Sequence, residues 1–177
     1  MYPYARMFKE LWKFRNAPRL DILGTHVSHH ICWPQDIDPW RELNNGRTLT
    51  LYDLGRIPLA IRAGFSTAAR KHGWGLTVAG SAVRYRRRVR VFDRVEMHSR
   101  CIGWDHRFLY MDQSMWKDGD CTSQALLRTA ITSKAGLVDP AQVARALGHS
   151  GISPDLPDWV NAWIAAEAER PWPPMRG

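Results

Sequence analysis

The sequence predicts an α+β fold in which a curved antiparallel sheet wraps a long buried helix. On a helical wheel, the apolar residues of 49–63 point in most directions, which is typical of a helix buried nearly all round. Segments with strand character follow this helix one after another. The 177 residues are 45% hydrophobic and hold no long polar tract, so they can bury a sizeable core. We expect one domain over 1–177, with its core at about 22–148 and helical extensions at both ends.

Composition indicates the cellular compartment of the protein and the chemical classes of its partners. The net charge of +8 favours acidic or phosphorylated partners, without choosing among nucleic acid, an anionic membrane and coenzyme A. Three widely spaced cysteines and the lack of an apolar secretory signal predict free thiols in a reducing, cytoplasmic compartment. No apolar run is long enough for a membrane span.

The first 33 residues combine a basic amphipathic segment with a histidine-rich strand. Residues 1–20 carry apolar and basic side chains at helical spacing, which favours a short helix docked on the domain and leaves peripheral binding to a membrane surface as the alternative. Residues 25–33 are β-branched and aromatic enough for a first strand. Its His29 and His30 point to opposite faces, so we expect no metal site there.

The segment DIDPWRELNNGRTLTLYDLGR, residues 36–56, joins that strand to the buried helix. Pro39 favours an extended entry, and Asn44 and Asn45 are suitable N-cap residues, so the helix is predicted to begin there. Pro58 is predicted to kink the helix or to end its first half.

Four strands and two helices are predicted downstream. The strands are expected at 76–92, 95–104, 107–116 and 122–134, with tight turns near Asp105 and at 117–120. In the first of them, period-two alternation places Arg84, Arg86, Arg88 and Arg90 on one face. A helix is predicted from the N-cap Asp139 to a stop at Gly148, and a final helix at 158–169.

Two ordered sets of motifs carry a resemblance to a known family. DIDPWRELNNGR resembles the D-x-D-x-x-x-H-x-N-N-x-R segment of the hotdog-fold acyl-CoA thioesterases, in their 4-hydroxybenzoyl-CoA thioesterase-like branch. The D-L-G-R at 53–56 and the F-D-x-V, G-W-D and Y-x-x-Q motifs within 92–120 are similar to the same branch. The chain departs from the family at Arg41 and Glu42, where Gly-His is usual, and at Thr48, where an aromatic residue is common.

This resemblance implies hydrolysis of an acyl-CoA thioester without a cofactor. The reaction needs a carboxylate and N–H dipoles that hold the developing oxyanion. The resemblance identifies Asp38 as nucleophile or general base, whereas a different subgroup uses an acid on the central helix, which would be Asp53. An Asx-turn for Asp38 and an ion pair of Asp53 with Arg56 are the structural alternatives. Glu42 is a candidate second acid.

Substrate binding is expected at the N-terminus of the buried helix and along Arg84, Arg86, Arg88 and Arg90, which we call the arginine row. Asn44, Asn45 and Gly46 would hold the reacting end, and the four arginines would contact the phosphates of coenzyme A; the alternative for the row is a solvated strand face. Nucleic-acid binding is not expected, because Tyr85 lies on the strand face opposite the four arginines. The resemblance also implies a homodimer or tetramer. A non-catalytic acyl-CoA or lipid-binding protein, in which Arg41 and Glu42 replace catalytic machinery, is the alternative function.

Overall fold

The computed structural model describes residues 2–176. Its helices are α1 (Tyr4–Lys13), α2 (Asn45–Arg62), α3 (Phe65–His72), α4 (Pro140–Ala146) and α5 (Asp158–Glu169), with a short 3-10 turn at Pro34–Asp36. Its strands are β1 (His26–Ile31), β2 (Gly75–Tyr85), β3 (Arg94–Trp104), β4 (Leu109–Lys117), β5 (Asp120–Ser133) and β6 (Gly136–Val138).

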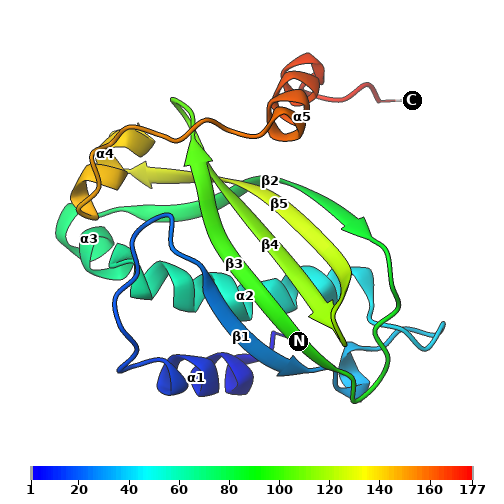
Figure 1. Ribbon diagram of the computed structural model, residues 1–177. Helices are drawn as coiled ribbons and strands as arrows, with labels where there is room; N and C mark the ends of the chain where they lie inside the picture. The colour runs from blue at the N-terminus through cyan, green and yellow to red at the C-terminus, as the bar shows by residue number, and fades with distance from the viewer. Residues whose placement is uncertain (1, 177) are drawn as a thin grey trace.

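One antiparallel sheet curves over the central helix α2 (Figure 1). Its strand order is β1-β3-β4-β5-β2, with β6 paired to the end of β5. The chain therefore crosses from β2, at one edge, to β3, next to the other edge, and returns through a meander. The α+β architecture predicted from the sequence is confirmed.

The helix α2 is held at its start by a cap and along its length by close packing. Asn44 is the N-cap, and its side-chain oxygen accepts a hydrogen bond from the amide of Arg47 at 3.2 Å. At Gly55 an added Cβ would stand 2.5 Å from Ser99 Oγ and 2.8 Å from Met97 Sδ, so only glycine lets the helix approach β3 this closely. The fully buried residues Leu51, Tyr52 and Leu54 confirm that the helix is buried by its neighbours.

Two helical details in the middle of the chain follow α2. Of the two alternatives predicted for Pro58, an end of the helix is excluded, because α2 continues through Pro58 to Arg62. After it, Gly64 turns the chain with φ +88°, and α3 follows, a helix that was not predicted from the sequence.

The strand predicted at 76–92 ends earlier than expected. The β2 ladder stops at Tyr85, which pairs with Ser123, and the amides of Arg86 and Arg87 then both donate to the carbonyl of Thr122. Residues beyond this point run as irregular chain, so their side chains do not alternate between two faces. The prediction of a single strand face bearing four arginines was therefore wrong.

The N-terminal segment forms a helix docked beside β1. Met7 and Glu10 are buried beneath α1, and Arg6 donates to the carbonyl of Ile31 at 2.8 Å. No helix of residues 2–176 is both long and apolar enough to cross a membrane.

The histidines of β1 alternate as predicted. His29 is exposed and lies 3.1 Å from Glu96, whereas His30 is buried on the opposite face and contacts Ser28 Oγ at 2.9 Å. Burial, with Arg6 nearby, lowers the pKa of His30 to about 3, so this side chain is neutral at physiological pH.

Candidate active site

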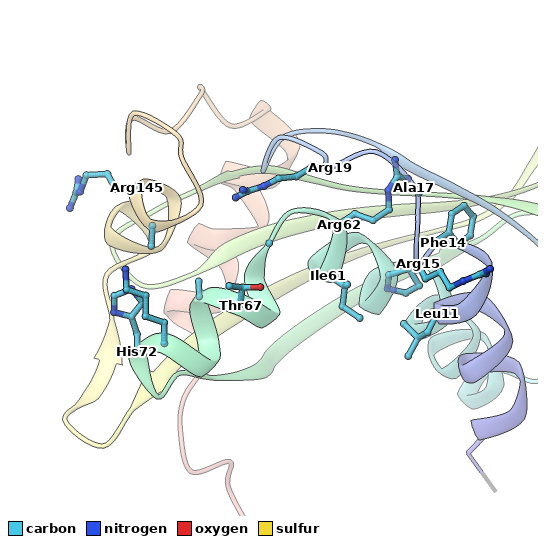
Figure 2. Close-up of a pocket in the computed structure, with 15 residues that line it drawn as sticks. Leu11, Phe14, Arg15, Ala17, Arg19, Ile61, Arg62, Thr67, His72 and Arg145 are labelled. Atoms are coloured by element: carbon cyan, nitrogen blue, oxygen red, sulfur yellow. The ribbon is translucent and has the colours of Figure 1, made fainter.

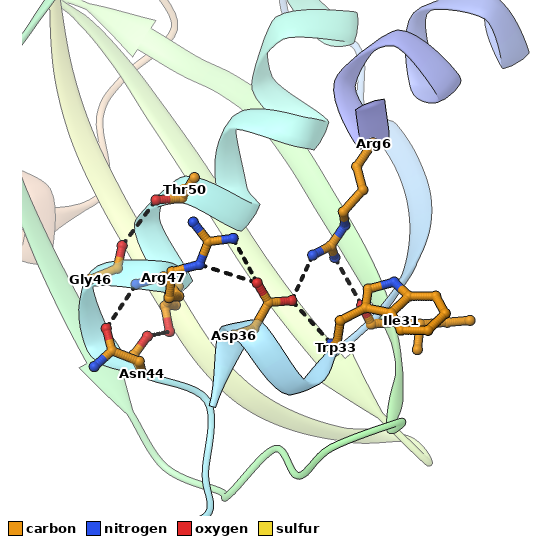
Figure 3. Close-up of polar contacts among 9 residues, drawn as sticks. Arg6, Ile31, Trp33, Asp36, Asn44, Gly46, Arg47 and Thr50 are labelled. Atoms are coloured by element: carbon orange, nitrogen blue, oxygen red, sulfur yellow. Dashed lines mark hydrogen bonds and ion pairs between the residues drawn. The ribbon is translucent and has the colours of Figure 1, made fainter. Parts of the chain in front are cut away.

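A buried carboxylate anchors the segment that enters α2 (Figure 3). The Asp36 side chain is 0% exposed and lies 2.6 Å from Arg6 Nη1 and 2.7 Å from Arg47 Nη2, while the Trp33 amide donates to it at 3.1 Å. Burial alone would raise the pKa of Asp36, but hydrogen bonds from Arg47, Trp33 and Arg6 outweigh it and hold the pKa below its ordinary value. Asp36 thus joins α1, the turn and the first turn of α2.

Asp38 lies two residues further, in a tight turn that brings it beside Glu42. Its Oδ1 accepts from the amide of Trp40 at 2.9 Å and from the amide of Glu42 at 3.4 Å, which is an Asx-turn. Its Oδ2 has no hydrogen-bond partner within the described residues. The Asx-turn predicted as the structural alternative is present, and one carboxylate oxygen stays available for chemistry.

The turn that contains Asp38 has a residue other than glycine in the left-handed backbone conformation. Arg41 has φ +61°, in the left-handed region that glycine adopts most easily. This is the position at which the hotdog thioesterases usually have the glycine of Gly-His. The shape of the turn is retained here although the residue type has changed.

A cavity of about 180 Å³ opens at the N-terminus of α2, and its lining is strongly basic. Asn45 contributes to one wall, and the amides of Asn45 and Gly46, at the start of the helix, have no acceptor in residues 2–176. Glu42 lies at the same cavity and pairs with Arg88, with 3.0 Å between Oε2 and Nε. The candidate second acid Glu42 therefore has a basic partner, Arg88.

The structure divides the predicted arginine row. Arg86 and Arg88 line this cavity, together with Arg87, which the strand prediction had placed on the opposite face. Arg84 instead lines a groove beside Trp159 and Trp163 of α5 and the strand β5. Arg90 follows in the next turn, where its amide donates to Asp93 Oδ2 at 2.7 Å.

Asp53 lies in the middle of α2 and forms the predicted ion pair with Arg56. Burial raises the pKa of Asp53, although Arg56 and a hydrogen bond from the Tyr2 hydroxyl act in the opposite direction. Arg56 also donates to Gln113 Oε1 at 2.9 Å, and Gln113 Nε2 donates to the carbonyl of Tyr52 at 2.8 Å. This cluster ties α2 to β4.

Three residues of the Asp36 and Asp53 clusters were not predicted from the sequence as site residues: Tyr2, Asp36 and Gln113. Asp36 is the first aspartate of D-x-D, and Gln113 ends the Y-x-x-Q motif, so both lay within recognised signals. Tyr2 had no such signal, because its contact with Asp53 joins segments far apart in the sequence.

A model of the thioesterase-like superfamily matches residues 32–164, which include the entry turn, α2 and the strands β2 to β6. The chain belongs to this superfamily. It is 28% identical to the protein THEM6 of Xenopus laevis over 147 residues, which cover 81% of this chain and 69% of that one. It is 26% identical to the protein THEM6 of Danio rerio over 156 residues, covering 86% and 77%.

Thioesterases of known structure share the fold of this chain. A probable thioesterase from Escherichia coli superposes with a TM-score of 0.66 at 14% identity, over 72% of this chain and 98% of that one. A 1,4-dihydroxy-2-naphthoyl-CoA thioesterase from Synechocystis superposes with a TM-score of 0.61 at 8% identity, over 70% and 95%. The protein has the hotdog fold.

Proposed function

We propose that this protein hydrolyses acyl-CoA thioesters at the N-terminus of α2, with Asp38 as nucleophile or general base. The observation that carries the proposal is that Asp38, which has an uncommitted oxygen, is hydrogen-bonded within its turn to Glu42, a residue that lines the basic cavity at the N-terminus of α2. The amides of Asn45 and Gly46 at that N-terminus have no acceptor in residues 2–176. Membership of the thioesterase-like superfamily supports the reaction class.

Each group supplies a different part of the chemistry. The amides of Asn45 and Gly46, at the positive end of the α2 dipole, can hold the oxyanion that forms when the thioester carbonyl is attacked. Asp38 attacks that carbonyl or takes a proton from the attacking water. The thiolate of coenzyme A then leaves and takes up a proton. If Asp38 is the nucleophile, the acyl group remains on it as a mixed anhydride, and water hydrolyses this anhydride to the free acid and the Asp38 carboxylate. Glu42 is the second candidate acid, since its carboxylate lines the same cavity.

Coenzyme A release from a panel of aliphatic and aromatic acyl-CoA thioesters tests the proposal. We expect the wild-type protein to turn over at least one of them, with free acid and thiol appearing in equal amounts. Binding of acyl-CoA without turnover of any member of the panel would support the non-catalytic alternative instead.

The basic cavity predicts a selective loss of substrate affinity. Replacing Arg86 and Arg87 by glutamine should raise KM by about tenfold and leave kcat nearly unchanged, because phosphate contacts act about equally in the ground and transition states. Steady-state kinetics with an acyl-CoA measures both constants.

Two controls make this prediction specific. The matched double variant Arg84→Gln with Arg90→Gln removes the same charge outside the cavity and should leave KM unchanged. With an acyl-pantetheine substrate, which lacks the nucleotide phosphates, the Arg86/Arg87 variant should match the wild type. An equal rise in KM for both double variants would mean that general charge, not the cavity, attracts the substrate.

We also propose that two copies pair through the β2 edge. β2 is hydrogen-bonded to β5 on one side, and Leu76 and Val78 are each 43% exposed on it. An uncovered apolar strand edge invites pairing with another chain. Light scattering at micromolar concentration should give at least twice the mass of one chain.

Lysine substitutions at the two sheet edges check this arrangement. Leu76→Lys with Val78→Lys should lower the mass to that of one chain, whereas Val27→Lys, on the opposite edge strand β1, should not. A monomeric wild type would rule out the pairing.

A further inference from the structure

The outer face of α1 is an unusual aromatic surface. Tyr4, Phe8 and Trp12 are four residues apart, so they form one stripe along the helix, and they are 64%, 67% and 67% exposed. The opposite face of the same helix is buried through Met7 and Glu10. The helix is therefore already docked on the domain, and the aromatic stripe is not needed for that docking.

Basic side chains border this stripe. Lys9 and Lys13 lie on the exposed surface of α1 next to the aromatic side chains, and Arg15 follows just after the helix. The Arg15 guanidinium lies 4.1 Å from the centre of the Trp12 ring and donates to the carbonyl of Trp12 at 2.6 Å. We call these six residues, Tyr4, Phe8, Lys9, Trp12, Lys13 and Arg15, the α1 face.

A basic groove of about 910 Å³ extends the positive charge on one side of α1 (Figure 2). It runs from the end of α1 past α2 to α3 and α4, and among the described residues its lining holds no carboxylate. Arg19 at its wall donates to the backbone carbonyl of Leu147, and Arg62 donates to the backbone carbonyl of Pro18 and contacts the neutral ring of His26. Their charge is thus left uncompensated by an acidic neighbour in the groove.

A second groove, of about 640 Å³, borders α1 on its other side. Its lining includes Lys9, His29, Trp33 and Arg94, and it also includes Glu10, whose side chain is buried. The aromatic stripe therefore stands between two grooves that both carry cationic side chains.

We propose that the α1 face docks this protein on the surface of an anionic phospholipid membrane. Tyrosine and tryptophan are the side chains most enriched at the level of lipid headgroups, and phenylalanine inserts its ring below them. Lysine and arginine beside such a stripe attract anionic headgroups, and the two grooves have the charge to receive their phosphates. The helix lies along the membrane plane and does not cross it.

The placement of α1 argues against a second copy of the chain as the occupant. α1 lies beside β1, through contacts such as Phe14 with His26 and Arg6 with Ile31. β1 is one edge of the sheet and β2 is the other. Pairing of two copies through β2 would leave the α1 face uncovered, and like charges on two α1 faces would repel each other.

Sedimentation with vesicles tests the proposal on the full chain. Wild-type protein should bind vesicles made of equal parts phosphatidylcholine and phosphatidylglycerol, and it should bind vesicles of phosphatidylcholine alone at least about tenfold more weakly. Replacing Phe8 and Trp12 by alanine should lower binding to the anionic vesicles by about tenfold or more. Both side chains are exposed, so the fold should persist, which circular dichroism checks.

Matched substitutions elsewhere separate this face from general stickiness and net charge. Trp172→Ala removes another exposed tryptophan and should leave vesicle binding unchanged. Lys9→Glu with Lys13→Glu should abolish binding, whereas Lys134→Glu with Arg107→Glu, which changes the net charge equally, should lower it by less than about threefold.

Three results would overturn the proposal. One is wild-type protein that stays in the supernatant with anionic vesicles at low salt. Another is equal binding to neutral and anionic vesicles. The third is a Phe8/Trp12 variant that still binds vesicles but loses mass in light scattering, which would identify the α1 face as a contact between copies.

Discussion

Asp38→Asn should lower kcat/KM for acyl-CoA hydrolysis by about 10²- to 10⁴-fold, the range typical for loss of a positioned acid or base. The amide keeps the size of the side chain and the acceptor that receives the amide of Trp40 at 2.9 Å. It cannot act as a nucleophile or take a proton from water at ordinary pH. Stopped-flow or continuous detection of released thiol measures the change.

A second aspartate supplies a matched control for this substitution. Asp139 accepts from the amide of Ala141 at 2.9 Å, the same two-residue geometry, but it caps α4, which lies away from the N-terminus of α2 (Figure 1). Asp139→Asn should therefore leave kcat/KM unchanged. Full activity of Asp38→Asn would contradict the assignment, and equal losses in both variants would point to damage to turn structure rather than to lost chemistry.

Asp36→Asn should lower the free energy of unfolding by about 3–5 kcal/mol, because it leaves two partly buried guanidinium groups without their anion. Arg6 and Arg47 both bind this carboxylate, whose side chain is 0% exposed. For a chain of this length, a loss of that size corresponds to a fall in Tm of roughly 10 °C. Urea unfolding and thermal melts measure it.

The pH dependence of this effect has a definite sign. Because the folded-state pKa of Asp36 lies below its ordinary value, the stabilisation should be full above about pH 4 and should disappear as the pH falls through the folded pKa. The exposed pair of Asp120 with Arg87 is the control, and Asp120→Asn should cost less than about 1 kcal/mol. A cost for Asp36→Asn no larger than this would show that the buried pair does not hold the turn.

Local chemistry explains why much of the fold could be predicted from the sequence. The N-caps Asn44 and Asp139 depend on side chains that act within three residues, and the structure has both. The final helix, predicted at 158–169, is present as α5. The turn between β4 and β5 likewise follows from Asp118 and Gly119, whose φ angles are +51° and +87°.

The errors arise where partners distant in the sequence decide the outcome. The alternation of RYRRRVR continues past Tyr85, but a strand ends where its partner ends, and β5 offers only the carbonyl of Thr122 beyond that point. The role of Asp36 depends on Arg6, which lies 30 residues earlier. The division of the arginine row could therefore not be read from the period alone.

Release of coenzyme A by wild type, Asp38→Asn and Asp53→Asn, measured side by side with one saturating acyl-CoA, tests most directly where hydrolysis takes place. Asp53 already pairs with Arg56 and Tyr2, so we expect Asp53→Asn to keep turnover within about tenfold of the wild type. We expect Asp38→Asn to lose about 10²-fold or more. The reverse order, with an active Asp38→Asn and an inactive but folded Asp53→Asn, would move the reaction centre from the N-terminus of α2 to the middle of the helix.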